Sequence, residues 1–275
     1  MGITPQEFKL IASFLHEHSG ILIAEGKEYL LENRLTVLMA QNGCNTFLEL
    51  HEKLQKDSGP LCTKVIDALT TNETLWFRDD SFFNALNDFI VPHLLEKAKR
   101  QSKVRIWSAA CSTGQEPYSV AMLLNHVGGA GVNFSPEKFE ILATDISPSA
   151  IVMATRGRYS QLAITRGMRK DFLNHYFTKK NMAYEINPAI RQMVTFKRFN
   201  LKGPFDSLGK FDFVLCRNVL IYFSEQLKCE IYDKIHRALN RDGFLAIGAS
   251  ESPRGLTTAF RQKRVGKAVL YKPVG

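Results

Sequence analysis

The stretch RIWSAACSTGQEPYS, from Arg105 to Ser119, is the most informative about the fold. In it a short apolar run is followed by one glycine, Gly114, and then by a glutamate, Glu116. A dinucleotide-binding turn would carry three glycines in the pattern G-x-G-x-x-G, so that backbone amides can crowd a pyrophosphate at a helix N-terminus. Only Gly114 is present. The shortage of glycine indicates a ligand that has no pyrophosphate.

Short apolar segments alternate with helical patterns from residue 104 onward, which is typical of a parallel sheet with crossover helices. The expected strands are 104–110, 139–146, 194–200, 211–217 and 243–248, with 268–272 as a late edge strand. The sequence therefore predicts an α/β fold with a mostly parallel sheet over residues 104–275.

Residues 1–70 show helical signals instead. Thr4 and Glu7 form a capping box around Pro5, with apolar residues on one face beyond it. Further helices are expected over 27–41, 46–55 and 60–69. We predict a small N-terminal all-helical domain, joined to the sheet by a connecting segment over 71–103.

Composition narrows the class of protein. With 275 residues, 45% of them hydrophobic and 23% charged, the chain can bury a large core. No run approaches the roughly 18 apolar residues of a membrane helix, and the N-terminus has no signal-peptide pattern. The five cysteines include no C-x-x-C pair, which argues against disulfides and a zinc site. We expect a cytoplasmic protein with reduced thiols and no metal.

The net charge of +9 is unevenly distributed. Residues 1–70 hold six Lys and Arg against nine Asp and Glu, whereas residues 156–198 hold ten against two. One interpretation of the basic stretch is a solvated face. The other is a docking surface for an acidic partner.

Ligands of open parallel sheets bind beyond the carboxyl ends of the strands. The first strand ends in the stretch AACSTGQE, which places Ala109, Gly114 and Glu116 at this edge, and Asp145 ends the second. An acid at the second strand can accept hydrogen bonds from both hydroxyls of a ribose. The alternative for Asp145 is a helix cap, a role that Ser147 could also fill.

Two further strands end in polar residues. Asn200 ends the third strand, Arg217 and Asn218 end the fourth, and Tyr222 follows four residues later. The Asn200 amide could bind an adenine edge, since it both donates and accepts. The alternatives are a turn residue at each strand end and a core aromatic at Tyr222. The succession of such strand ends favours a site.

The connecting segment contains TTNETLWFRDDSFF, from Thr70 to Phe83, in which Arg78 stands among five large apolar side chains. An arginine is costly to bury unless it is paired. We therefore expect Arg78 to meet a carboxylate, either of a ligand or of a neighbour such as Glu116.

The segments TTNETLWFRD, IWSAACSTGQEPYS, ILATDIS, FNL and FDFVLCRNVLIYF, in this order, resemble the bacterial CheR family of chemotaxis receptor methyltransferases. That family methylates receptor glutamates with S-adenosylmethionine. The resemblance implies a Rossmann-like methyltransferase domain at 104–275 with a small β-subdomain inserted at about 158–193. It also implies S-adenosylhomocysteine as product, the cytoplasmic domain of chemoreceptors as partner, and a monomer.

The resemblance carries site residues as well. It implies that the cofactor is surrounded by Asn72, Thr74, Arg78, Glu116, Asp145, Asn200, Leu201, Arg217 and Asn218, to which the position at a strand end adds Ala109. Arg78 and Tyr222 would lie near the transferred methyl group, and with Asp145 they form the expected catalytic set. S-adenosylmethionine has no pyrophosphate, in agreement with the single glycine.

The proposed chemistry suits these residues. A glutamate with a pKa of about 4.3 is already ionised at neutral pH, so methyl transfer to it needs positioning and no general base. A guanidinium and a phenol can hold the carboxylate by charge-assisted hydrogen bonds. Methyltransferases acting on amides or exocyclic amines commonly carry Asn or Asp before Pro-Pro and an aromatic. The stretch RNVLIY lacks these prolines, which disfavours nucleic-acid bases or glutamine as acceptors.

Two features depart from the family pattern. The second helix offers mainly Lys27 and Arg34 for receptor docking, so the basic insertion is a second candidate surface, with Arg166, Arg169 and Lys170 meeting the acidic receptor bundle. The segment YFTKKNMAYEI lacks the glycine-containing loop of members that bind a C-terminal receptor peptide. We expect that this chain does not need such a peptide.

Two other functions remain open at this point. An RNA methyltransferase is supported by the basic charge, although the chain lacks a base-handling motif. A non-catalytic sensor of S-adenosylmethionine or its product is disfavoured by the presence of Arg78, Asp145 and Tyr222.

Overall fold

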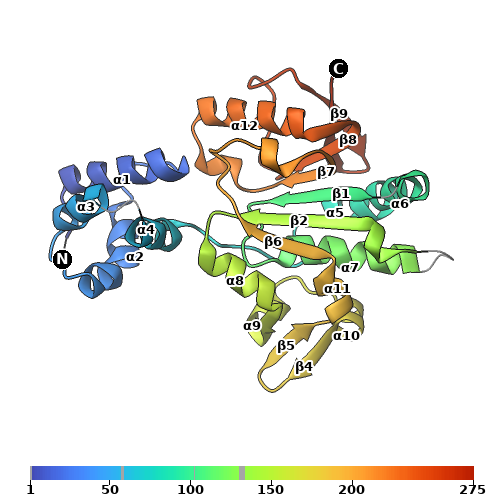
Figure 1. Cartoon of the computed structure of the whole chain (residues 1–275), viewed down its shortest axis with the longest axis horizontal. Coiled ribbons are helices and arrows are strands. Elements are labelled where there is room, and N and C mark those ends of the chain that lie inside the picture. The colour runs from blue at the N-terminus through green and yellow to red at the C-terminus, as the bar shows by residue number, and fades with distance from the viewer. Residues whose placement is uncertain (1, 57–58, 102, 130–133) are drawn as a thin grey trace. The chain divides into compact units, whose positions relative to one another are not determined.

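The computed structural model of the chain describes residues 2–56, 59–101, 103–129 and 134–275 (Figure 1). The chain divides into two compact units. One, here the helical unit, contains the chain up to Thr71 together with Ile221–Lys228, and the other, the sheet unit, contains Asn72–Leu220 and Cys229–Gly275.

The described part of the helical unit up to Thr71 contains α1 (Pro5–Ser19), α2 (Glu28–Gln41), α3 (Phe47–Lys56) and α4 (Pro60–Leu69). The predicted capping box at the start of α1 is confirmed, since the Glu7 N–H donates to Thr4 Oγ1 while Glu7 Oε2 accepts from the Thr4 N–H. Beyond α1, Ile21 pairs with Phe223 in an antiparallel bridge. That bridge attaches the segment 221–228 to this unit.

The sheet unit is built on seven strands in the order β6-β2-β1-β7-β8-β10-β9. The first five of these are parallel neighbours, whereas β10 runs antiparallel to β8 and β9 antiparallel to β10. Their bounds are β1 (Val104–Ala109), β2 (Phe139–Asp145), β6 (Val194–Arg198), β7 (Phe211–Cys216), β8 (Leu239–Ile247), β9 (Phe260–Val265) and β10 (Ala268–Pro273). The predicted α/β class with a mostly parallel sheet is confirmed.

The prediction for the last strands was wrong in one respect. Residues 268–272 were expected at the sheet edge, but β10 lies between β8 and β9, and β9 is the edge. The sequence of β9 is FRQKRV, whose four central residues are all polar and exposed. Such a strand shows no apolar alternation, although lysine and arginine are common on edge strands because they discourage pairing with other chains.

Helices lie between the strands. Before β1 come α5 (Asp80–Ala85), the π-helix η1 (Leu86–Ile90) and α6 (Val91–Arg100), and after it come α7 (Gln115–Gly129) and the 3-10 helix η2 (Pro136–Lys138). The later helices are α8 (Pro148–Arg156), α11 (Pro188–Gln192), η3 (Asp206–Leu208), η4 (Leu220–Tyr222) and α12 (Glu225–Ala238). Among the residues described, no helix is both long enough and apolar enough to span a membrane.

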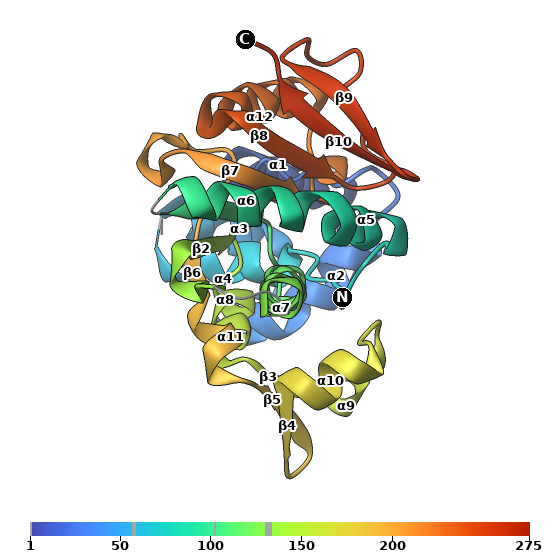
Figure 2. The ribbon, with the colours of Figure 1, turned by 90° about the vertical axis from the view of Figure 1, so that its right-hand side faces the viewer.

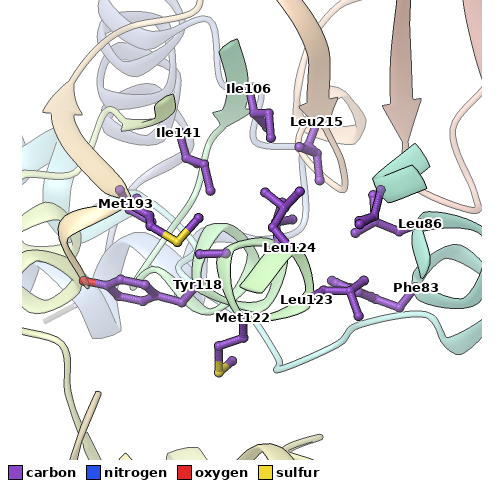
Figure 3. Packing of buried hydrophobic residues seen from close by; sticks show 14 of the residues in the cluster. Phe83, Leu86, Ile106, Tyr118, Met122, Leu123, Leu124, Ile141, Met193 and Leu215 are labelled. Carbon is purple, nitrogen blue, oxygen red and sulfur yellow. The ribbon is translucent and has the colours of Figure 1, made fainter. Parts of the chain in front are cut away.

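Helix α7 is at the centre of the core and is buried along most of its length. Figure 3 shows Leu124 directed toward Ile106 of β1 and Leu215 of β7, while Leu123 lies beside Phe83 of α5. The helix is thereby held between the sheet and the segment that precedes β1, which fixes its N-terminus beneath the end of β1.

A second, three-stranded antiparallel sheet has the order β3-β5-β4 and belongs to a segment inserted between α8 and β6. The inserted elements are β3 (Arg158–Ser160), α9 (Gln161–Thr165), α10 (Lys170–Tyr176), β4 (Phe177–Lys180) and β5 (Ala183–Ile186). Figure 2 shows this small sheet projecting away from the large one, beyond α7. The predicted small β-subdomain, here called the insertion, is therefore present.

The turn after β1 is built from left-handed residues. Ala110, Ser112 and Gly114 have φ of 56°, 52° and 93°. A Cβ on Gly114 would lie 2.9 Å from Ala154 Cβ of α8 and 3.1 Å from the Tyr159 hydroxyl. The glycine is therefore required by backbone conformation and by the approach of α8 and β3, which gives it a structural reason independent of any ligand.

We expect Gly114→Ala to lower the free energy of unfolding by about 1–3 kcal/mol, because a left-handed conformation is strained for a residue with a Cβ. The measurement is the midpoint of urea unfolding. Gly129→Ala is the control, because no described heavy atom lies within 4 Å of its added Cβ. Equal midpoints for the two variants would contradict this account of the turn.

Candidate active site

The carboxyl ends of the parallel strands meet at one edge of the large sheet. There β1 has β2 on one side and β7 on the other, so the direction of chain progression reverses between β1 and β7. Ligands of open α/β sheets bind at such a switch point. The strand ends place Ala109, Asp145, Asn200, Arg217 and Asn218 along this edge.

Asp145 is almost completely buried at the end of β2. Its Oδ2 accepts from the Ser112 N–H at 2.7 Å, and its Oδ1 accepts from the Ser147 N–H at 2.9 Å. The cap of α8 is Ser147, whose hydroxyl accepts from the Ala150 N–H. Asp145 thus braces the left-handed turn after β1, and because a carboxylate has about four lone-pair directions it can accept from further donors.

Arg217 at the end of β7 holds the site together. Its side chain is only 1% exposed, and Nη1 donates to Glu116 Oε2 at 2.9 Å. Nη2 donates to Asp79 Oδ2 at 2.5 Å and to the Arg78 carbonyl at 2.9 Å, while the guanidinium lies 4.0 Å from the centre of the Phe82 ring. Nε is buried and has no hydrogen-bond partner among the described residues.

Of the two partners predicted for Arg78, Glu116 is paired with Arg217 instead, and the carboxylate of a ligand stays a prediction. Glu116 Oε1 accepts from the Ser108 hydroxyl, and its other oxygen accepts from Arg217. The arginine that is buried against an aromatic ring and paired with carboxylates is therefore Arg217, which lies 139 residues from Arg78 in the sequence. The half-buried Arg78 contributes its carbonyl to this network.

The backbone around Arg78 is strained on both sides. Phe77 has φ of 49° and Asp79 has φ of 72°. Each such left-handed residue costs about 1–3 kcal/mol unless its surroundings compensate for it. The compensating contacts are the Phe77 N–H donating to Ser119 Oγ and the Arg217 guanidinium donating to the next two residues. They fix the backbone of Arg78.

The other residues predicted around the cofactor make contacts within the chain or are partly buried. Asn72 is bonded to the turn after β1 and to the turn after β2, because its carbonyl accepts from Ser112 Oγ and its Nδ2 donates to Ser147 Oγ. Thr74 is half-buried and Leu201 is buried. Asn200 Oδ1 accepts from the Lys202 N–H, so in this structure its side chain makes the turn contact that was its alternative role.

Glu251, in the loop after β8, was missed by sequence reasoning. Its carboxylate accepts four backbone N–H groups, those of Asn218, Val219, Leu220 and Gly248, at 2.6 to 3.1 Å. These bonds fix the turn after β7, in which Asn218 has φ of 59°. The signal in the sequence is an acid shortly after the fifth expected parallel strand, 243–248.

Two thiols lie close to these strand ends. Burial, followed by the charges of Asp145 and Glu116, raises the pKa of Cys111, and burial with the charges of Glu251 and Glu116 raises the pKa of Cys216. Both thiols are therefore neutral at physiological pH and are poor nucleophiles. None of the five cysteines, all of them described, forms a disulfide.

The arginines predicted to dock a receptor make contacts within the chain. In α2, Arg34 Nη1 donates to the Leu69 and Thr70 carbonyls and so caps the C-terminus of α4. In the insertion, Arg166 pairs with Glu73 at 2.8 Å, and the Arg169 guanidinium lies 4.7 Å from the centre of the Phe77 ring. Lys27 and Lys170 are exposed.

Tyr222 belongs to the helical unit. It ends η4, and its carbonyl accepts from the Leu22 N–H at 2.9 Å. Its role beside the methyl group stays a prediction. Among the described residues, no group of three or more His, Cys, Asp or Glu side chains could hold a metal ion.

A mostly parallel seven-stranded sheet with these residues at its switch point defines the class of S-adenosylmethionine-dependent methyltransferases. The model of the CheR methyltransferase, SAM binding domain, matches residues 72–269, and that of the CheR methyltransferase, all-alpha domain, matches residues 6–70. The chain belongs to the CheR methyltransferase family.

Curated relatives agree with this assignment. The chain is 40% identical over 273 residues to chemotaxis protein methyltransferase 1 of Pseudomonas aeruginosa, which covers 99% of both chains. It is 40% identical over 268 residues to chemotaxis protein methyltransferase Cher2 of Pseudomonas putida, covering 97% of each. With chemotaxis protein methyltransferase 1 of Vibrio cholerae it shares 36% over 272 residues, or 98% of each. The resemblance predicted from the sequence is confirmed, and the chain is an S-adenosylmethionine-dependent methyltransferase of bacterial chemotaxis.

We expect Glu251→Gln to lower the free energy of unfolding by about 1–3 kcal/mol and to weaken cofactor binding. The amide NH2 would face backbone N–H donors, and buried donors without an acceptor cost about this much. Urea unfolding and calorimetric titration with S-adenosylhomocysteine measure the two effects. The control is Glu52→Gln, at an exposed position of α3. Wild-type stability and affinity in Glu251→Gln would show that the turn after β7 does not depend on this carboxylate.

Proposed function

We propose that this chain transfers the methyl group of S-adenosylmethionine to glutamate side chains of chemoreceptors, giving methyl esters and S-adenosylhomocysteine. The observation that carries the proposal is the Arg217 network, which holds Arg78 in place at the switch point of a sheet of this family. Because the backbone of Arg78 is fixed there, its guanidinium stays within reach of the switch point, where it can help to position a carboxylate.

The residues at the strand ends fit the cofactor. Asp145 would accept the ribose hydroxyls, and Asn200 with Leu201 would border the adenine. The buried Arg217 Nε has no partner in the described part of the chain, and an acceptor atom of the ligand would satisfy it. Asn72, Thr74, Ala109, Glu116 and Asn218 would complete the surroundings. When bound, the cofactor supplies an electrophilic methyl group on a sulfonium.

The acceptor chemistry needs no base. A glutamate carboxylate with an ordinary pKa of about 4.3 is ionised at neutral pH and attacks the methyl carbon in line with the departing sulfur. Arg78 and Tyr222 would aim the carboxylate by hydrogen bonds. A tight ion pair would lower the nucleophilicity of the carboxylate, so Arg78 is expected to share its donors between cofactor and substrate.

Receptor docking is proposed for the exposed cations. Lys27 of the helical unit and Lys170 of the insertion have exposed side chains, so both are accessible to an acidic helical partner. Arg34, Arg166 and Arg169 already have partners within the chain, so their contribution to docking is expected to be smaller. We further propose a cytoplasmic, monomeric enzyme that needs no receptor C-terminal peptide.

We expect Asp145→Asn to weaken binding of both S-adenosylmethionine and S-adenosylhomocysteine at least about tenfold, because hydrogen bonds to an ionised acceptor contribute about 1.5–3 kcal/mol. Isothermal titration calorimetry measures the loss, and thermal unfolding checks that the variant is folded. Asp233→Asn, at an exposed position of α12, is the control. A folded Asp145→Asn protein with wild-type affinity would remove Asp145 from the cofactor site.

We expect methyl label from S-adenosylmethionine to appear on a receptor cytoplasmic fragment and to be released as methanol by mild alkali, because esters hydrolyse under these conditions and N-methyl groups do not. Arg78→Gln should lower kcat more than tenfold, since the side chain would no longer carry a charge for the carboxylate. Label that resists alkali, or that appears on added RNA and not on the receptor, would contradict the proposed acceptor.

A further inference from the structure

The insertion packs against the segment that contains Arg78 and forms hydrogen bonds with it. Trp76 is almost completely buried. Its backbone N–H donates to the Arg166 carbonyl at 3.1 Å, and its indole Nε1 donates to the Ala163 carbonyl at 3.0 Å. Its ring meets those of Tyr159 and Phe177 edge-on, at centroid distances of 4.8 and 5.4 Å. Every one of these partners lies in the insertion.

The next residue is held in the same way. The Phe77 ring contacts both Arg169, whose guanidinium is 4.7 Å from its centre, and Phe172, whose ring centroid is 4.9 Å away. Ion pairs flank this contact, Arg166 with Glu73 at 2.8 Å and Arg169 with Asp80 at 4.0 Å. The two arginines therefore attach to the segment on either side of Arg78.

Gly167 permits the closest approach between the two segments. Its φ is 94°, and a Cβ at this position would lie 2.2 Å from the Trp76 carbonyl oxygen. No side chain fits in that space. The loop Arg166–Arg169, here called the clamp loop, thus presses its backbone directly against the residue two positions before Arg78.

The insertion also contacts the turn after β1, where the Tyr159 hydroxyl donates to the Thr113 carbonyl at 2.8 Å. The same strand, β3, thereby joins the Trp76 ring to the turn that Asp145 braces. Displacement of the insertion would move both the segment of Arg78 and this turn.

We propose that the clamp loop positions Arg78 for methyl transfer, with Arg166, Gly167 and Arg169 as positioning residues. The inference deepens the proposed function, since it rests on the role given there to Arg78. It assigns to the insertion a part in forming the active site, and it gives Arg166 and Arg169 a task that does not require a receptor.

The ion pairs of Arg166 and Arg169 orient the clamp loop on the segment of Arg78 more than they add to the free energy of that contact. The Arg166 and Glu73 side chains are 44% and 67% exposed, and exposed pairs contribute little to stability. Buried Trp76 and the close approach at Gly167 supply most of the attachment. Loss of both arginines should therefore loosen the segment without unfolding the chain.

The experiment compares Arg166→Met/Arg169→Met with Arg158→Met. The control removes an exposed arginine of the same insertion whose ion-pair partner, Glu185, lies within the insertion. Three quantities are measured on the full chain: amide hydrogen exchange over residues 72–80, affinity for S-adenosylhomocysteine in the absence of receptor, and kcat and KM for a receptor fragment.

We expect the double variant to exchange the Trp76 amide several-fold faster, to bind the product several-fold more weakly and to lose several-fold in kcat, with an unchanged melting temperature. Arg158→Met should match the wild type. Gly167→Ala should act in the same direction more strongly, but the arginine variants keep the test valid if that protein does not fold.

Wild-type exchange and product affinity in the double variant, with only the KM for the receptor raised, would overturn the proposal and return both arginines to receptor docking. If the receptor is not the methyl acceptor, kcat and KM cannot be measured, but amide exchange and product affinity still test whether the clamp loop positions Arg78. Failure of the clamp and failure of the proposed acceptor are therefore distinguishable.

Discussion

The pairing of the buried Arg217 guanidinium with Glu116 and Asp79 is the interaction on which the site depends. A buried cation without partners costs several kcal/mol, and removing one partner of a buried pair is strongly destabilising. The partners come from β7, from the first turn of α7 and from the segment before α5, which are far apart in the sequence. The site therefore forms only when these parts have docked together, so its geometry is a property of the completed fold.

Carboxylates that accept backbone amides are the second constraint. The turns at the switch point contain non-glycine residues with positive φ, namely Ala110, Ser112 and Asn218. Such conformations persist where surrounding bonds compensate for the strain. Asp145 accepts a hydrogen bond from the Ser112 N–H, and Glu251 accepts one from the Asn218 N–H. Each acid therefore stabilises one strained turn at the edge of the sheet. The acids shape the site before any ligand arrives.

Strand positions and strand-end residues could be predicted because apolar runs and the polar residues that follow them are local signals. The pairing of Arg217 could not, because it depends on which arginine the folded sheet brings to Glu116. The pairing of Asp79 with Arg217 could not be predicted for the same reason. The edge strand β9 was missed because its exposed residues are polar throughout, and period-two alternation appears only where one face is buried.

The charge of the insertion shows how composition and geometry differ. Residues 156–198 count ten cations against two anions, which suggests a strong field for an acidic partner. Arg166 and Arg169, however, face Glu73 and Asp80, which lie outside that window in the sequence and beside it in space. Paired charges partly cancel at a distance, and salt screens what remains beyond about 8–10 Å. Glu73 and Asp80 therefore reduce the field that a partner would meet at Arg166 and Arg169, whereas Lys170 and Lys179 remain exposed.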